Sequence, residues 1–197
     1  MKIGILGGTF DPPHNGHLSL AQFAMRELQL DEVIFLPANR NPMKSGKIQA
    51  PAKHRLGMID RLIQTQPGMS YSDMEITRGG PSYAVDTLAE LQMVRPAEYW
   101  FLMGVDALRG IGGWKSPSRL MKLCRIAVAV RPPHIVHDVL ARLPEEFRGK
   151  VDILEMPPME ISSTDIRDRM HRGQNVSPWM SAEVLQYIQA NRLYQNA

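Results

Sequence analysis

Cysteine is almost absent from this chain: among 197 residues there is one, Cys124. A single thiol cannot form an intrachain disulfide, so a disulfide-stapled fold is excluded, and a thiolate metal cage would need several chains. The sequence also lacks any run of about 18 apolar residues, the length that a membrane-spanning helix needs. Its first apolar stretch runs directly into Gly7 and Gly8 without a cleavage motif, so no secretory leader is expected. We therefore expect a cytoplasmic protein that does not associate with membranes.

An excess of one charge is also missing, because 23 lysines and arginines face 20 aspartates and glutamates, for a net charge of +3. The basic residues are scattered, and the densest group, at 167–172, is interrupted by Asp168. This pattern argues against nucleic acid as the partner and suits a small anionic substrate better. Hydrophobic residues make up 44% of the chain, which excludes global disorder and allows a single hydrophobic core.

Short apolar runs alternate with stretches that have apolar residues at helical spacing. The runs lie at 3–6, 33–36, 99–103, 125–130 and 151–154, and we expect a further strand near 72–76. Strands separated by helices predict βαβ units, and so an α/β fold with a doubly wound parallel sheet. We expect one domain over residues 1–197, with a small helical segment from about residue 160 to 197.

Ligands of such sheets bind beyond the carboxyl ends of the strands. This rule points to residues 7–17, to residues 104–106 and to the segment after residue 155. A long polar stretch at 38–51 is predicted to be a loop, and long loops inside compact domains are often functional. We expect it to act as a lid.

The first of these places carries the string Gly7-Gly8-Thr9-Phe10-Asp11-Pro12-Pro13-His14-Asn15-Gly16-His17. It follows a strand and opens a helix, whose first N–H groups and positive dipole end can bind an anion. His14 and His17 are three residues apart, which places both imidazoles on one face, where they could donate to phosphate oxygens. We expect little structural role for His17. The alternatives are a glycine turn with two surface histidines, or a metal site with only two ligands.

The second place carries Ile161-Ser162-Ser163-Thr164-Asp165-Ile166-Arg167. Ser162 and Asp165 fit a capping box, so a helix begins here and supplies a second anion site. Arg167 lies one turn into that helix and can reach a polyphosphate with its planar fork. Taken alone, the string also fits a well-capped helix with a solvated arginine.

Together the two strings resemble the two signatures of the nucleotidylyltransferase superfamily, which implies a Rossmann-like fold and ATP as a substrate. By this resemblance, three residues are expected to be catalytic: His14, His17 and Arg167. The residues expected to bind ATP are Gly8, Thr9, Phe10, Gly104, Asp106, Ser162, Ser163 and Thr164. Among these, the resemblance places Asp106 at the sugar hydroxyls.

A third set of residues resembles one family of this superfamily, the bacterial nicotinate-nucleotide adenylyltransferases. Gly80-Pro81-Ser82-Tyr83 precedes a helix, a strand ends in Gly104-Val105-Asp106, and Trp114 follows Asp106 by eight residues. The family implies transfer of the adenylyl group of ATP to nicotinate mononucleotide, giving deamido-NAD and pyrophosphate. It implies Mg²⁺ that accompanies ATP, and we expect no metal site of the protein's own. The residues expected at the acceptor are Lys44, Ser82, Tyr83, Ala84, Trp114 and Lys115.

The chain departs from the family at three acceptor positions. Ala84 stands where a threonine is common, Lys115 where a tyrosine is frequent, and residues 41–44 lack a usual histidine. Two other functions stay open: a different small adenylyltransferase, such as phosphopantetheine adenylyltransferase, and a nucleotide-binding module without catalysis. The second of these would have lost a histidine or Arg167, and all three residues are present.

Overall fold

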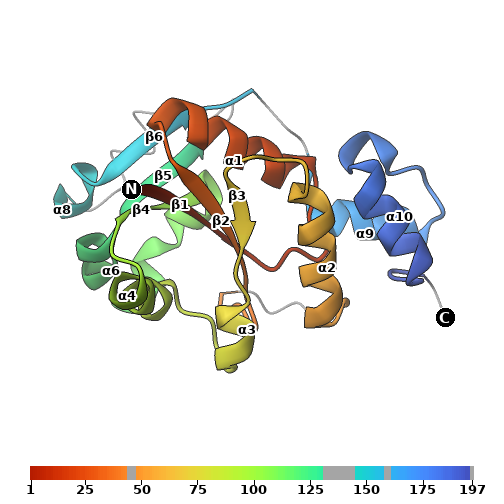
Figure 1. Ribbon diagram of the computed structural model, residues 1–197, viewed down its shortest axis with the longest axis horizontal. Helices are drawn as coiled ribbons and strands as arrows, with labels where there is room; N and C mark the ends of the chain where they lie inside the picture. The colour runs from red at the N-terminus through yellow and green to blue at the C-terminus, as the bar shows by residue number, and fades with distance from the viewer. Residues whose placement is uncertain (44–47, 131–144, 158–160, 196–197) are drawn as a thin grey trace.

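The computed structural model describes residues 1–43, 48–130, 145–157 and 161–195 (Figure 1). In this part of the chain one sheet has six strands: β1 (Lys2–Gly8), β2 (Glu32–Pro37), β3 (Met69–Tyr71), β4 (Glu98–Gly104), β5 (Arg125–Val130) and β6 (Val151–Glu155). The order is β3-β2-β1-β4-β5-β6, and all neighbours are parallel. The strand order reverses between β1 and β4, which is the switch point of a doubly wound sheet. The predicted fold is therefore confirmed.

Helices cover both faces of the sheet (Figure 1). The elements between the strands are α1 (Asn15–Leu28), α2 (Ala52–Ile63), α3 (Met74–Arg78), α4 (Ala84–Val94), α5 (Val105–Arg109), η1 (Ile111–Gly113), α6 (Pro117–Leu123) and α8 (Glu145–Arg148). After β6 come α9 (Ser163–His171), η2 (Ser177–Trp179) and α10 (Ala182–Ala190). Among the residues described, no helix has the length and apolarity needed to cross a bilayer.

The strand expected near 72–76 was misplaced. The edge strand β3 ends at Tyr71, and α3 begins at Met74. The cause is local, because the hydroxyl of Ser72 accepts the N–H of Met74 at 3.3 Å and the carboxylate of Asp73 accepts the Thr77 hydroxyl at 3.2 Å. Such side-chain bonds start helices and compete with strand pairing.

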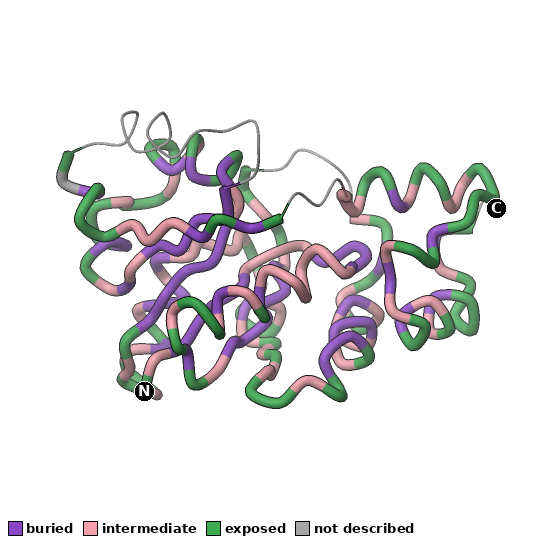
Figure 2. Tube along the Cα trace, turned by 90° about the horizontal axis from the view of Figure 1, so that it is seen from above, coloured by how far each residue is buried: buried purple, intermediate pink, exposed green. Residues whose placement is uncertain are grey.

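Successive side chains along the central strands point to opposite faces of the sheet. They therefore divide the core into two clusters, one on each face. Along β4, Tyr99, Phe101 and Met103 join the cluster under α4, α5 and α6. Trp100 and Leu102 join the opposite cluster, under α1 and α2. The buried residues follow the strands through the middle of the molecule (Figure 2).

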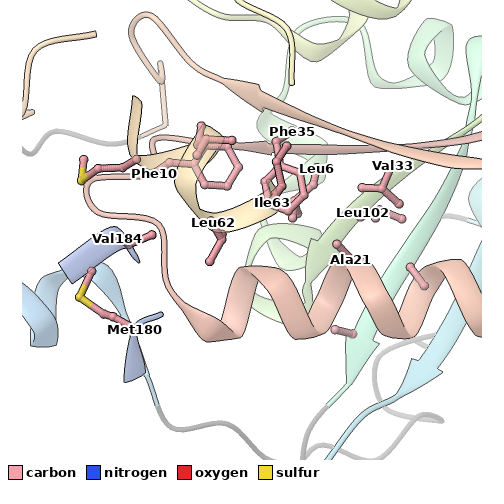
Figure 3. Packing of buried hydrophobic residues seen from close by; sticks show 14 of the residues in the cluster. Leu6, Phe10, Ala21, Val33, Phe35, Leu62, Ile63, Leu102, Met180 and Val184 are labelled. Carbon is pink, nitrogen blue, oxygen red and sulfur yellow. The ribbon is translucent and has the colours of Figure 1, made fainter. Parts of the chain in front are cut away.

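The helices after β6 pack beside α2 and share its core cluster. Val184 of α10 and Met180 before it belong to the same cluster as Phe10 and Leu62 (Figure 3). The approach of α10 to α2 is close, since a Cβ atom at Gly57 would lie 2.3 Å from the Tyr187 hydroxyl. The expected helical segment after residue 160 is therefore present, and it packs against the loop that follows β1.

Candidate active site

Two cavities adjoin one another where β1 and β4 end, at the switch point of the sheet. The larger has a volume of about 760 Å³ and the smaller about 300 Å³. Both values lie in the range typical of small-molecule sites. The larger cavity brings together most of the residues predicted to be catalytic or to bind ATP, namely Gly8, Thr9, Phe10, His14, His17, Gly104, Ser162, Ser163, Thr164 and Arg167.

The two histidines lie side by side at the start of α1, with ring centroids 3.8 Å apart. His14 is the N-cap of the helix, and its Nδ1 accepts the N–H of Gly16 at 3.2 Å. The Nδ1 of His17 accepts the backbone N–H of His14 at 3.2 Å, which completes a capping box. His17 therefore has a structural contact in addition to the expected site role, and the size of its contribution to stability stays a prediction. Because each Nδ1 accepts a hydrogen bond, the ring hydrogen is assigned to Nε2, which gives two neutral donors.

The start of α9 docks onto the loop that follows β1, so the two sequence signatures meet. Arg167 donates from Nη1 to the Asp11 carbonyl oxygen at 2.7 Å, and from Nη2 to the Thr164 hydroxyl at 3.3 Å. The Ser163 hydroxyl donates to the Pro12 carbonyl at 2.8 Å. Ser162 caps the helix as predicted. Two helix starts and an arginine therefore border one cavity, an arrangement suited to a polyphosphate.

One residue expected to bind ATP lies outside both cavities, and another lines the larger cavity with a buried side chain. Asp106 lines neither cavity, because the first turn of α5 leaves its side chain 77% exposed and 3.3 Å from Arg109. Phe10 borders the large cavity, but the residue is only 1% exposed. Its ring packs against Phe35 and His17, with centroids 5.7 Å and 4.9 Å away. Phe10 therefore anchors the loop to the core rather than presenting its ring to a ligand.

The smaller cavity collects the residues expected at the acceptor: Ser82, Tyr83, Ala84, Trp114 and Lys115. Lys44, the sixth, lies outside the described residues. Trp114 meets Phe101 edge to face, with centroids 5.6 Å apart. The ammonium of Lys115 lies 2.7 Å from the Asp86 carboxylate and 4.7 Å from the centre of the Tyr83 ring. Its charge is therefore paired with Asp86 at the start of α4.

A buried carboxylate that the sequence did not indicate also borders the smaller cavity. Glu75 is 5% exposed and accepts the Thr87 hydroxyl at 2.6 Å. Arg78 donates to the same hydroxyl at 2.6 Å, and its guanidinium lies 4.0 Å from the Glu75 carboxylate. This group connects α3 to α4 and partly offsets the charge of Glu75.

The loop after β2 contributes residues that no motif identified. Arg40 and Ile48 line the larger cavity, whereas Asn41 and Met43 line both. Gly8 is the third residue common to the two cavities. The length and polarity of the stretch at 38–51 were the signal that this loop has a function, but they did not indicate which of its residues face a ligand.

Buried polar groups support the floor of the larger cavity. The carboxylate of Asp11, a residue 3% exposed, accepts hydrogen bonds from the N–H groups of Gln49 and Ala50 and from the Tyr194 hydroxyl. Burial raises the pKa of Tyr194, and the hydrogen bond to Asp11 raises it further. These contacts join segments that are far apart in the chain, so local motifs could not reveal them.

Arg55 is a second buried group under the cavity and is 2% exposed. Its Nη1 donates to the carbonyl oxygens of Thr9 and Ala38, at 2.9 Å and 2.7 Å. Burial lowers the pKa of Arg55, and the nearby charge of Asp11 acts in the opposite direction. The arginine thereby joins the loop after β1 to the end of β2.

The described residues contain no group of three or more His, Cys, Asp or Glu side chains able to hold a metal ion. The Asp11 carboxylate, which borders the cavity, already accepts three hydrogen bonds and is poorly suited to bind a cation. Burial raises the pKa of Cys124 to about 12, so this thiol is a core residue and not a nucleophile.

Comparison with known proteins identifies the class first. A family described as Cytidylyltransferase-like matches residues 5–169, and the chain belongs to this family of nucleotidyltransferases. Within it, the chain is 39% identical over 199 residues to a protein of Dehalococcoides mccartyi named "Probable nicotinate-nucleotide adenylyltransferase", with 98% of this chain and 97% of the relative covered. A protein of the same name from Thermomicrobium roseum is 38% identical, with 98% and 92% covered. These relatives place the chain among the nicotinate-nucleotide adenylyltransferases.

A solved structure has the same fold. The nicotinic acid mononucleotide adenylyltransferase of Plasmodium falciparum, complexed with NaAD, superposes with a TM-score of 0.80 at 19% sequence identity. The match covers 98% of this chain and 97% of that one. The α/β architecture is therefore common to both chains.

Proposed function

We propose that this chain transfers the adenylyl group of ATP to nicotinate mononucleotide, giving deamido-NAD and pyrophosphate. The observation that carries the proposal is the pair of cavities with a common wall at Gly8, Asn41 and Met43. One cavity has phosphate-binding groups, and the other has an aromatic ring and a helix start. Two nucleotides bound in them would bring their phosphates together at that wall, as the names of the relatives also suggest.

The reaction needs no nucleophile from the protein. An oxygen of the acceptor's 5′-phosphate attacks the α-phosphorus of ATP, a new P–O bond forms, and the bond to the bridging oxygen breaks as pyrophosphate leaves. Both substrates are anions, so the contribution of the protein is to hold them in line and to stabilise charge on the transferred and leaving groups. We assign this to the Nε2–H groups of His14 and His17, to Arg167 and to the start of α9.

Mg²⁺ belongs to this proposal as the counter-ion of ATP. Magnesium is commonly held by substrate phosphates with few protein ligands. An ion bound in this way would partly neutralise the phosphates of the nucleotide. Thr9 and the first backbone N–H groups of α9, at Ser162, Ser163 and Thr164, then complete the contacts of the ATP phosphates.

Nicotinate is assigned to the smaller cavity, stacked on Trp114. Its carboxylate would face the first N–H groups of α4, near Ser82, Tyr83 and Ala84, because a helix start favours an anion. Glu75 borders the same cavity, so the acid is favoured only if its carboxylate is oriented toward the helix start and away from Glu75. We further propose that residues 1–197 act as one domain in the cytoplasm.

The test is an acceptor panel with ATP and Mg²⁺, followed by pyrophosphate release. A carboxamide would leave one hydrogen bond unmade, at a cost of about 1–3 kcal/mol, so we expect kcat/KM at least about tenfold higher for nicotinate than for nicotinamide mononucleotide. Trp114→Ala should weaken both acceptors alike, since stacking does not distinguish the substituents. Equal use of both acceptors would make this a dual-specificity enzyme, and turnover of phosphopantetheine alone would reject the proposal.

A further inference from the structure

Asp11 is where separate parts of the chain meet beneath the larger cavity. Its Oδ1 accepts the Tyr194 hydroxyl at 2.7 Å and the Ala50 N–H at 3.0 Å. Its Oδ2 accepts the Gln49 N–H at 2.8 Å. Two of these donors belong to the end of the loop after β2, and the third lies 183 residues away in sequence. The carboxylate therefore connects the loop after β1, the loop after β2 and the segment after α10.

The backbone on both sides of this contact adopts an unfavourable conformation. Tyr194 has a φ of 59°, and Phe10, next to Asp11, has a φ of 53°. Non-glycine residues rarely adopt positive φ, and they keep it where the surrounding structure determines it. Tyr194 is also 7% exposed, within the core cluster that contains Phe10. Its hydroxyl thus has a fixed position, set by packing around its ring.

We propose that Tyr194 is a positioning residue for adenylyl transfer: its hydroxyl fixes the Asp11 carboxylate, which in turn fixes both loops that border the ATP cavity. This role for Tyr194 rests on the proposed function, because adenylyl transfer is the reaction that the tyrosine would assist. The position of Arg167 depends on the same group, because its Nη1 donates to the carbonyl of Asp11 at 2.7 Å. Without the tyrosine hydroxyl, the carboxylate lacks one of its three donors. The loop after β1, whose Asp11 carbonyl accepts the Arg167 guanidinium, is then held less firmly.

The test compares two tyrosine-to-phenylalanine variants. Tyr194→Phe removes the hydroxyl at Asp11 and keeps the ring. Tyr187→Phe is the matched control, because that hydroxyl on α10 lies 3.2 Å from the His54 Nδ1 on α2, and no hydrogen bond among the described residues joins it to Asp11. Both variants lose one buried or half-buried hydrogen bond, so both should lower the melting temperature slightly.

The kinetic effects should separate the two variants. A hydrogen bond to a charged group is worth enough to change a rate about tenfold, so Tyr194→Phe should lower kcat by about that factor and raise KM for both nucleotides. Tyr187→Phe should stay within about twofold of the unaltered protein. If Tyr194→Phe changes only the melting temperature, as the control does, the positioning role is rejected.

Two further measurements test whether Tyr194 acts through Asp11. Asp11→Asn combined with Tyr194→Phe should be no worse in kcat than Asp11→Asn alone, because the tyrosine acts through the aspartate. Additive losses would contradict that path. Calorimetric binding of ATP, in the absence of any acceptor, should weaken in Tyr194→Phe and not in Tyr187→Phe. This readout does not depend on the acceptor, so failure of the proposed function and failure of the positioning role remain distinguishable.

Discussion

Each histidine of the first signature caps α1 through Nδ1, and the proposed function gives its Nε2 a second task at the phosphates. The Nδ1 atoms accept backbone N–H groups at the start of α1, and this contact holds the rings in place. Both residues also line the larger cavity. A capping box normally uses Ser or Thr with Glu or Gln. Here imidazoles replace both partners, so the proposed phosphate-binding groups are also the helix cap.

Substitution of His17 should separate the two tasks. Glutamine is an ordinary residue at this capping position, so His17→Gln can keep the bond to the His14 N–H and lose the imidazole. His17→Ala loses both. Removing a donor to developing charge costs roughly 10²–10³ in rate, so both variants should lose turnover to that extent. Only His17→Ala should also lose stability, by about 0.5–2 kcal/mol.

Steady-state kinetics and urea titration of the two variants provide the check. Nearly normal turnover in His17→Gln would show that the imidazole has no part in the reaction. Equal stability of the two variants would show that the capping contact contributes little.

Short sequence motifs made it possible to predict which segments line the larger cavity. Glycines, paired histidines and a capping serine identify themselves within a dozen positions, which is why residues 7–17 and 162–167 were found. Asp106 was carried over by resemblance, and the first turn of α5 directs it to Arg109 instead. Tyr194 carries no local signal, because its partner lies 183 residues away.

At the scale of elements, α2 supports the site from below through a buried arginine. Arg55 donates to one carbonyl at the start of the loop after β1 and to another directly after β2, so it sets the separation of these two segments. The helical spacing of apolar residues predicted α2, but it did not indicate which face would carry a buried charge. The apolar run at 99–103 was easier to interpret, because a strand buried on both faces has a continuous apolar sequence.

Replacement of Arg55 should destabilise the fold far more than replacement of an exposed arginine. Arg55→Met leaves the carbonyls of Thr9 and Ala38 without their donor, at a cost of about 1–3 kcal/mol for each group, so we expect a loss of about 2–6 kcal/mol. Arg61→Met on the same helix is the control. Its side chain is 48% exposed and pairs with Asp60, and such surface pairs contribute about 0–1 kcal/mol.

Urea denaturation measures both variants on the same scale. Similar midpoints for Arg55→Met and Arg61→Met would mean that water or neighbouring groups satisfy the two carbonyls. Arg55→Met should also raise KM for ATP, because Thr9 belongs to the wall of the larger cavity.

At the scale of the whole molecule, the reversal of strand order explains why one site can hold two nucleotides. Helices leave the sheet in opposite directions on either side of β1 and β4, and the space between them is where both cavities lie. The alternation of strands with helices predicted a doubly wound parallel sheet, but not the order of its strands. The division of the space into two cavities depends on side chains from the loop after β2, which the sequence did not place.

A dinucleotide that spans both cavities should stabilise the protein more than either of its halves. At 100 times its dissociation constant, a ligand adds about 2.7 kcal/mol to the free energy of unfolding, which corresponds to roughly 5–10 °C for a chain of this size. We therefore expect deamido-NAD to raise the melting temperature more than AMP or nicotinate mononucleotide at the same concentration. Thermal unfolding with each ligand is the measurement.

Trp114→Ala provides the internal control for this experiment. It should reduce the shift caused by the dinucleotide and leave the shift caused by AMP unchanged, because Trp114 borders only the smaller cavity. Equal shifts in melting temperature for AMP and deamido-NAD would show that the nicotinate half of the dinucleotide gains no binding free energy from the smaller cavity.

The hydrogen bond between Asp11 and Tyr194 also sets an order of assembly during synthesis. Translation proceeds at about 5–20 residues per second, so the 183 positions between the two residues take about 10–40 s to be made. The backbone donors at residues 49 and 50 follow Asp11 within 38 and 39 positions, and they are available early. When only β1, α1 and β2 have emerged from the ribosome, the nascent chain therefore has an incomplete nucleotide site. Its last hydrogen bond forms only after the segment beyond α10 has emerged.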